Sequence, residues 1–212
     1  MYLDSDLIIR GSLHDLYDTD LSSVAIAAVR DNEYFNIQEY NRLRYEPKFG
    51  YFNAGVLLIN LDYWRKNDCY KTFTSFISSY PERLKKHDQD VLNSIFYNCK
   101  KWLPLKYNLS VGFMCNEIPF PYTEWEEIIE ARKRPVIIHF SDKIKPWHEN
   151  CLHPYKNEYY KYQALTPFRN LPKTKIPLTK KQQIRHILAK FKLCKDIEKR
   201  KDFYDHSLYL ND

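Results

Sequence analysis

The sequence predicts an α/β protein with a mixed sheet flanked by helices. Segments with the pattern of strands alternate with segments of helical spacing, which is the order typical of α/β folds. The strongest strand, Tyr51–Asn60, is an unbroken apolar run, and this indicates that both of its faces are covered. The 212 residues provide for one sizeable domain with its own core. No apolar run in the sequence approaches the roughly 20 residues that a membrane-spanning helix needs.

The first part of the chain alternates strands with short helical segments. Leu3–Ile9 is predicted to be a buried strand. Ser12 and Asp15 have the spacing of a helix cap, so a short helical turn is expected there. Val24–Val29 is predicted to be a second strand, and the polar and aromatic stretch Asp31–Gly50 a loop with some helix.

The part after the central strand is mostly helical. Thr123 and Glu126 have the spacing of a capping box, which predicts a helix that runs through Arg132. Apolar residues at helical spacing predict the other helices. The remaining elements expected here are helices at Asp62–Tyr80 and Asp88–Tyr97 and a strand at Pro135–Phe140.

The chain is predicted to divide into a domain of residues 1–166 and an extension of residues 167–212. Three prolines mark a linker at the start of the extension. Thr179 and Gln182 then predict the start of a basic amphipathic helix. Its apolar face would carry Ile184, Ile187, Leu188 and Phe191. The basic residues of this region are Lys173, Lys175, Lys180, Lys181, Arg185, Lys190, Lys192, Lys195, Lys199, Arg200 and Lys201.

Such a basic face has two interpretations. It binds phosphate, as in a lipid headgroup, a phosphorylated glycan or a nucleic acid, or it is a solvated helix face. Nothing in the sequence resembles a known nucleic-acid-binding module, so no nucleic-acid partner is predicted. The five cysteines form no C-x-x-C pair and are odd in number, so the sequence indicates neither a zinc site nor a disulfide framework and fits a reducing cytoplasm. The four glycines cannot make a glycine-rich phosphate loop.

Two aspartates near the N-terminus are the first candidates for a functional site. Asp4 and Asp6 are two residues apart, and in an extended segment such residues point to the same side. Two carboxylates that are buried so near each other have a high free-energy cost unless something neutralises their charge. A divalent cation such as Mg²⁺ or Mn²⁺ would do so, since it prefers oxygen ligands. The alternative is a strand end followed by a polar turn.

Three later segments extend this pattern. Tyr51–Asn60 contains an Asn-Ala-Gly step, and His87–Asn93 is a polar cluster that opens a helix. The strand Val136–Phe140 ends in a histidine and is followed by Lys143, Lys145, Pro146 and Trp147. Together with Asp4-Ser5-Asp6, and in this order, the segments resemble family 8 glycosyltransferases. These are retaining enzymes of the GT-A fold that use nucleotide sugars, and the resemblance spans Tyr2–Cys151.

The resemblance implies a metal site and a donor site. Asp4, Asp6 and His139 would bind Mn²⁺ or Mg²⁺, and the imidazole ligand favours Mn²⁺. Lys145 would contact the donor diphosphate. The residues implied to bind the donor are Asp4, Ser5, Asp6, Asn53, Ala54, Asp88, Gln89, His139 and Lys145.

The resemblance also implies the catalytic residues. Gln89 would lie nearest the anomeric carbon, with Asp88 beside the transferred sugar. An amide is a poor nucleophile, whereas retaining glycosidases use a carboxylate. A front-face displacement is therefore expected, in which the leaving phosphate accepts the proton of the acceptor hydroxyl.

The function expected from these residues is transfer of glucose or galactose from a UDP-sugar to a glycan acceptor such as lipopolysaccharide or another cell-surface glycan. The location expected is the cytoplasm, with peripheral contact between the C-terminal helix and the anionic inner face of the membrane. GT-A enzymes carry a nucleotide-binding β-α-β unit ahead of the Asp-x-Asp, so a GT-A-like fold that is truncated at its N-terminus and lacks the nucleobase pocket is expected. The alternative is a catalytically inactive remnant that acts as a membrane-peripheral or partner-binding module.

Overall fold

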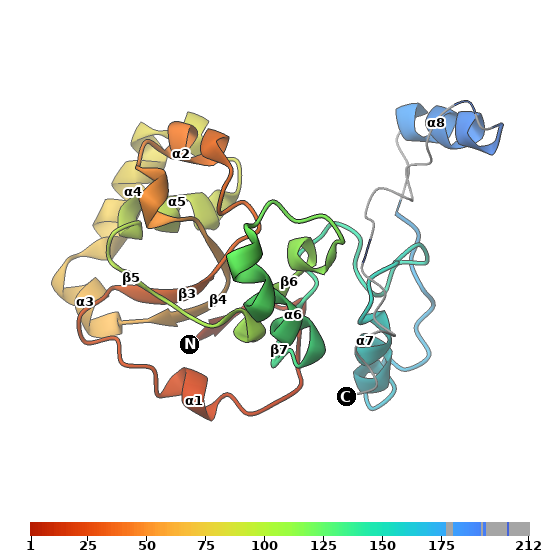
Figure 1. The fold of residues 1–212 in the computed structure, drawn as a ribbon, viewed down its shortest axis with the longest axis horizontal. Helices are drawn as coiled ribbons and strands as arrows, with labels where there is room; N and C mark the ends of the chain where they lie inside the picture. Colours follow the sequence, from red (N-terminus) through yellow and green to blue (C-terminus); the bar gives the residue numbers. More distant parts are fainter. Residues whose placement is uncertain (177–179, 192, 194–202, 204–212) are drawn as a thin grey trace.

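The computed structural model describes residues 1–176, 180–191, 193 and 203, which form two mixed sheets flanked by helices (Figure 1). This confirms the predicted α/β class, with two sheets where the sequence predicted one. The four-stranded sheet has the order β1 (Tyr2–Leu3), β4 (Phe52–Ile59), β3 (Ile26–Arg30) and β5 (Lys100–Trp102). The three-stranded sheet has the order β2 (Leu7–Ile9), β7 (Ile137–His139) and β6 (Leu109–Ser110).

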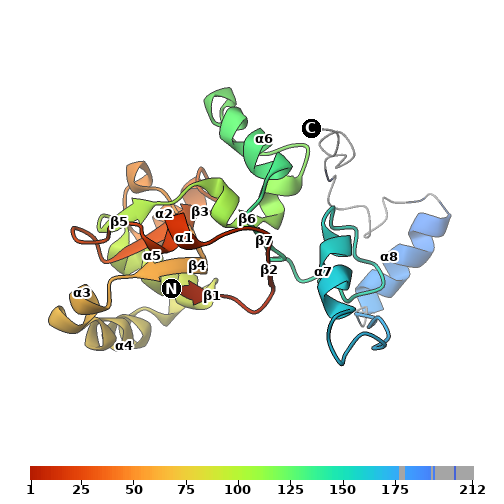
Figure 2. The same cartoon turned by 90° about the horizontal axis from the view of Figure 1, so that it is seen from below.

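The N-terminal segment connects the two sheets, so the single strand predicted at Leu3–Ile9 is wrong. β1 pairs antiparallel with β4, and β2 pairs antiparallel with β7, where Leu7 lies opposite His139. Figure 2 shows the chain leaving the first sheet and joining the second. The break falls at Asp4–Asp6, where the chain passes from its pairing with β4 to its pairing with β7.

The central strands β3 and β4 are antiparallel, whereas β5 runs parallel to β3. Successive residues of β3 are buried on opposite sides: Ala27 and Val29 in one apolar cluster, Ile26 and Ala28 in another. Phe52, Val56 and the other residues of β4 up to Leu58 are also buried. Both faces of the central strands are therefore covered, as the unbroken apolar run predicts.

Helices cover the four-stranded sheet on the side where α5 packs on β4 (Figure 1). The later helices lie beside the smaller sheet and beyond it. The helices are α1 (His14–Tyr17), α2 (Ile37–Leu43), α3 (Leu61–Lys66), α4 (Cys69–Ser79), α5 (His87–Phe96), α6 (Trp125–Lys133), α7 (Lys156–Gln163) and α8 (Lys180–Lys190). Short 3-10 turns lie at Pro47–Phe49, Pro81–Arg83, Leu105–Tyr107, Val111–Met114 and Tyr122–Glu124.

The single helix predicted at Asp62–Tyr80 is wrong, because it is divided into α3 and α4. The Tyr63 carbonyl near the end of α3 accepts two hydrogen bonds from Asn67, one of 3.0 Å from its backbone N–H and one of 2.7 Å from its side-chain amide. Asp68 then adopts a left-handed backbone conformation with φ of 45°. This conformation interrupts the right-handed helix before Cys69.

The capping box predicted from Thr123 and Glu126 is also wrong. Residues Tyr122–Glu124 form a 3-10 turn, and α6 begins at Trp125. Among the described residues, α6 has no capping hydrogen bond from the side chain of its N-cap residue, Glu124. Glu124 pairs with Arg30 of β3 instead, so a tertiary ion pair replaces the local cap.

The C-terminal helix is observed as α8, and the part after it is described only at Phe191, Leu193 and Phe203. Thr179, the predicted cap, lies outside the described residues. The apolar side chains predicted to share one face are exposed, from 40% for Leu188 to 72% for Phe191. Among the described helices, none has the length and hydropathy to cross a bilayer.

Candidate functional site

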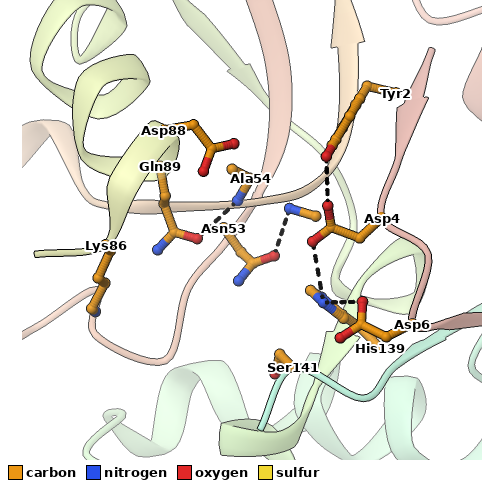
Figure 3. A pocket seen from close by; sticks show the side chains of 11 residues that line it. Tyr2, Asp4, Asp6, Asn53, Ala54, Lys86, Asp88, Gln89, His139 and Ser141 are labelled. Atoms are coloured by element: carbon orange, nitrogen blue, oxygen red, sulfur yellow. Dashed lines mark hydrogen bonds and ion pairs between the residues drawn. The ribbon is translucent and has the colours of Figure 1, made fainter. Parts of the chain in front are cut away.

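A polar cavity of about 240 Å³ lies where the two sheets meet. It is bordered by the segment that joins β1 and β2, by β4, by the start of α5 and by the end of β7 (Figure 3). The lining residues are Tyr2, Asp4, Asp6, Asn53, Ala54, Gly55, Lys86, Asp88, Gln89, His139 and Ser141. The cavity therefore collects residues from four separate parts of the sequence.

Asp4, Asp6 and His139 form a cluster on one wall of this cavity. His139 Nε2 lies 3.6 Å from Asp4 Oδ2 and 3.4 Å from Asp6 Oδ1. One candidate ligand atom from each residue lies within 4.8 Å of the others. The imidazole is buried, whereas both carboxylates are partly exposed to the cavity. Two carboxylate oxygens and one imidazole nitrogen suit a divalent cation, and this donor set fits Mn²⁺.

Neighbouring groups hold the two carboxylates in place. The Tyr2 hydroxyl donates a hydrogen bond of 2.7 Å to Asp4 Oδ1, and this bond raises the pKa of Tyr2 to about 12. Lys145 Nζ lies 2.5 Å from Asp6 Oδ2 and 2.6 Å from the Phe140 carbonyl. Burial raises the pKa of Asp6, but hydrogen bonds from His139 and Lys145 outweigh it and hold this pKa well below its usual range. Asp6 is therefore a carboxylate at neutral pH.

The opposite wall carries the polar residues of β4 and α5 (Figure 3). Gln89 Oε1 accepts a hydrogen bond of 3.0 Å from the Ala54 N–H. Its Nε2 donates to the Tyr51 hydroxyl at 3.0 Å and to Asp31 Oδ2 at 3.3 Å. Asp88, in the first turn of α5, has an exposed side chain. The amide of Gln89 is thus fixed by three partners, while the carboxylate beside it stays accessible.

The structure brings together almost all of the residues that the sequence singled out. Asp4, Asp6, Asn53, Ala54, Asp88, Gln89 and His139 line one cavity. Lys145 reaches the cavity through its ion pair with Asp6. Ser5 has an exposed side chain and lies outside the lining set.

Several residues around the cavity were not singled out from the sequence. Tyr2, Lys86 and Ser141 line it, and the one sequence feature that could have identified them is that each lies close to a motif in the chain. Asp31 and Asn108 lie behind it and are buried at 5% and 0% exposure. No local pattern marks these two residues, because their partners come from distant parts of the chain.

Residues 1–151 match the family described as "Glycosyl transferase family 8". The chain belongs to glycosyl transferase family 8. It is 30% identical over 177 residues to general stress protein A of Bacillus subtilis, a match that covers 81% of this chain and 60% of that protein. It is 31% identical over 175 residues to lipopolysaccharide 1,2-glucosyltransferase of Escherichia coli, covering 81% and 51% respectively. The chain thus spans 60% of the first of these two curated relatives and 51% of the second.

The fold is also that of this family. The galactosyltransferase LgtC, solved with donor and acceptor sugar analogues, superposes with a TM-score of 0.65 at 25% identity. The match covers 86% of this chain and 63% of LgtC. The bifunctional glycosyltransferase WbbM matches with a TM-score of 0.67 at 23% identity, over 79% of this chain and 32% of WbbM, and this likeness concerns the fold alone. The two mixed sheets flanked by helices are therefore GT-A-like.

Proposed function

We propose that this family 8 protein is a retaining, metal-dependent hexosyltransferase that moves glucose or galactose from a UDP-sugar to a glycan acceptor such as lipopolysaccharide or another cell-surface glycan. One observation carries the proposal: the Asp4, Asp6 and His139 cluster and the Asp88–Gln89 pair line the same cavity. A nucleotide sugar has a diphosphate that needs a cation and a sugar that needs polar partners, and the two walls match these two parts. The similarity to a glucosyltransferase and a galactosyltransferase favours a hexose donor.

The metal-side residues would act on the leaving group. Bound by Asp4, Asp6 and His139, Mn²⁺ or Mg²⁺ would supply Lewis-acid stabilisation of the charge that develops on the departing diphosphate. Lys145, already paired with Asp6 at the edge of the cavity, would contribute a second positive charge there. Asp6 remains ionised at neutral pH because His139 and Lys145 stabilise its charged form.

The sugar-side residues would bind and orient the hexose. Asn53 and Ala54 border the cavity between its two walls, and Asp88 presents an accessible carboxylate to sugar hydroxyls. Gln89 carries an amide that is fixed by Ala54, Tyr51 and Asp31, so it would orient the sugar rather than attack it. Retention of configuration would then follow from a front-face displacement. The acceptor oxygen forms the new bond to the anomeric carbon as the diphosphate leaves, and its proton passes to the departing phosphate.

Two further features of the proposal concern the rest of the chain. Residues 1–166 would form the catalytic part and residues 167–212 the extension. The exposed apolar side chains of α8, such as Ile184 and Ile187, lie among basic residues and favour peripheral contact with an anionic membrane, at the cytoplasmic face. The same feature would remain in a protein that had lost catalysis and served as a membrane-peripheral module.

The test is turnover of UDP-glucose and UDP-galactose in the presence of Mn²⁺, followed by UDP release and by the anomeric configuration of the sugar product. Retained configuration, and loss of turnover on Asp88→Asn but not on the exposed control Asp62→Asn, would support the proposal. An inverted product would contradict the retaining mechanism. Binding of neither UDP-sugar would leave the non-catalytic module as the better account.

A further inference from the structure

A chain of buried hydrogen bonds runs behind the cavity from Asp31 to His139. Asn53 Nδ2 donates to Asp31 Oδ2 at 2.9 Å, and Asn108 Nδ2 donates to Asn53 Oδ1 at 2.8 Å. Asn108 Oδ1 lies 2.9 Å from His139 Nδ1. All four side chains are buried, with between 0% and 6% of their surface exposed. These bonds are therefore costly to rearrange, because a buried polar group that loses its partner has no water to replace it.

The direction of the chain is fixed at its Asp31 end. A carboxylate accepts hydrogen bonds and a backbone N–H only donates them. Asp31 Oδ1 accepts from the Glu33 N–H at 3.0 Å, so Oδ2 is the atom that faces Asn53. Asn53 Oδ1 accepts from the Gly55 N–H at 2.9 Å. Asn53 must therefore turn its NH₂ group toward Asp31 and its oxygen toward Gly55. In the opposite orientation, the NH₂ group of Asn53 would face the Gly55 N–H, and two donors cannot form a hydrogen bond.

This orientation propagates to His139. Because the Asn53 oxygen faces Asn108, Asn108 must present its NH₂ group there. Its oxygen is then left for His139 Nδ1, and an oxygen can only accept. His139 Nδ1 must therefore carry a proton. In the neutral imidazole the lone pair is therefore on Nε2, the atom that faces Asp4 and Asp6, and only the protonated imidazolium can donate a hydrogen bond from Nε2 to Asp6.

We propose that Asp31 is a positioning residue that sets the metal-binding tautomer of His139 through Asn53 and Asn108. This inference rests on the proposed function, since it assigns how the histidine of that site is prepared for a cation. Asp31 Oδ2 also accepts from Gln89 Nε2 at 3.3 Å. One buried carboxylate thus orients the histidine on one wall of the cavity and the Gln89 amide on the other.

The inference predicts which changes weaken metal binding. Partners behind a metal-ligating histidine typically change metal affinity by about 10–100-fold when they are removed. Asn108→Ala removes the acceptor for Nδ1–H and leaves both tautomers possible. Asp31→Asn replaces one acceptor atom by a donor, so at least one of the three bonds to Glu33, Asn53 and Gln89 must become a donor–donor contact.

The direct test is the tautomer of His139 in the unmodified chain without metal. Long-range ¹H–¹⁵N NMR at alkaline pH, where an imidazole is neutral, reports which ring nitrogen holds the proton. The His139 signal is assigned by its loss in His139→Gln. We expect a proton on Nδ1 and none on Nε2. A neutral His139 protonated on Nε2 would overturn the proposal, and this result does not depend on whether the protein binds a sugar donor.

The second readout is Mn²⁺ affinity, measured by the electron paramagnetic resonance signal of free Mn²⁺. We expect Asn108→Ala and Asp31→Asn to weaken Mn²⁺ binding by about 10–100-fold. The control is Asn60→Ala, which removes a partly buried amide that donates to the carbonyls of Leu21 and Val24 away from the cavity. Equal Mn²⁺ affinity in Asn108→Ala and Asn60→Ala would overturn the proposal. Absence of Mn²⁺ binding in the unmodified chain would instead contradict the proposed metal site, and the NMR result would still decide the tautomer.

Discussion

The backbone of Gly55 lies against the imidazole of His139, with no room for a side chain between them. A Cβ atom at Gly55 would lie 2.3 Å from Cε1 and 2.8 Å from Nδ1 of His139, and 2.9 Å from Asp4 Oδ2. Carbon atoms in contact are normally about 3.5–4.0 Å apart. β4 therefore packs its backbone directly behind the Asp4, Asp6 and His139 cluster, and the Asn-Ala-Gly step of the sequence permits this approach.

We expect Gly55→Ala to weaken Mn²⁺ binding by about tenfold or more, because the added methyl group must displace His139 or Asp4 from the cluster. Calorimetric titration with Mn²⁺ measures the effect. Gly11→Ala is the matched control, since a Cβ there would lie 3.5 Å from Val136 Cγ1, an ordinary contact. Equal Mn²⁺ affinities in the two variants would show that the close approach of Gly55 does not shape the site.

Gln89 gives a second prediction. Its amide is oriented by Ala54, Tyr51 and Asp31, so we expect it to stabilise the transition state more than the bound substrate. We expect Gln89→Ala to lower kcat more than it raises KM for the UDP-hexose. Steady-state kinetics measure both constants, with Gln38→Ala on the exposed surface of α2 as the control. A change confined to KM would assign Gln89 to donor binding alone.

Asp90 gives a prediction about stability, because it is a fully buried carboxylate paired with Arg42. Asp90 Oδ2 lies 2.7 Å from Arg42 Nη1, and its oxygens also accept from Tyr51 and from the N–H groups of Lys85 and Lys86. Asp90→Leu leaves the Arg42 charge without this partner, so we expect a loss of about 3–5 kcal/mol in the free energy of unfolding. Urea unfolding measures it, and Asp62→Leu on the exposed surface is the control.

The same carboxylate predicts a pH dependence. Burial raises the pKa of Asp90, but bonds from Arg42, Lys86 and Tyr51 outweigh it, so this pKa is lower in the folded than in the unfolded protein. The unfolded protein then binds more protons, and stability falls as the pH drops. The contribution of Asp90 is complete above about pH 4, near the pKa of an unfolded aspartate, and is lost as the pH falls through the folded value. We expect the stability difference between the unmodified chain and Asp90→Leu to shrink in acid; a constant difference would contradict this assignment.

The C-terminal extension gives a prediction about membranes. Ile184 and Phe191 are 60% and 72% exposed, among basic residues. We expect the chain to co-sediment with anionic but not neutral vesicles, and the binding to weaken with salt as charges are screened. Replacement of Ile184 and Phe191 by Asp should abolish vesicle binding and leave the melting temperature nearly unchanged, because both side chains are exposed. If the replacement destabilises the domain and the unmodified chain does not bind anionic vesicles, the helix α8 is structural.

Local patterns were enough to predict the central elements of the fold. Local periodicity or composition is enough to recognise the apolar run of β4, the polar start of α5 and the strand that ends at His139, without knowledge of their tertiary contacts. The motif order then brought Asp4, Asn53, Gln89 and His139 into one candidate site, and these residues line one cavity. β5 and β6 were not predicted, because they have three and two residues and no period to read.

Other features depend on contacts between distant segments. The break at Asp4–Asp6 follows from pairing with two different sheets, which no window of residues contains. Glu124, the N-cap residue of α6, forms an ion pair with Arg30 of β3 and does not cap the helix with its side chain. Asp31 and Asn108 have no motif of their own, since their importance lies in buried bonds to Asn53 and His139. Tertiary contacts decide all of these features, so the sequence alone did not reveal them.

The melting temperature with Mn²⁺ and UDP tests the central claim most directly, because a ligand that binds only the folded state stabilises it. We expect Mn²⁺ and UDP together to raise the melting temperature of the unmodified chain. The double variant Asp4→Asn/Asp6→Asn should lose this rise, whereas the exposed control Asp62→Asn/Glu82→Gln should keep it. A rise of the same size in Asp4→Asn/Asp6→Asn would contradict the assignment of Asp4, Asp6 and His139 as the metal site.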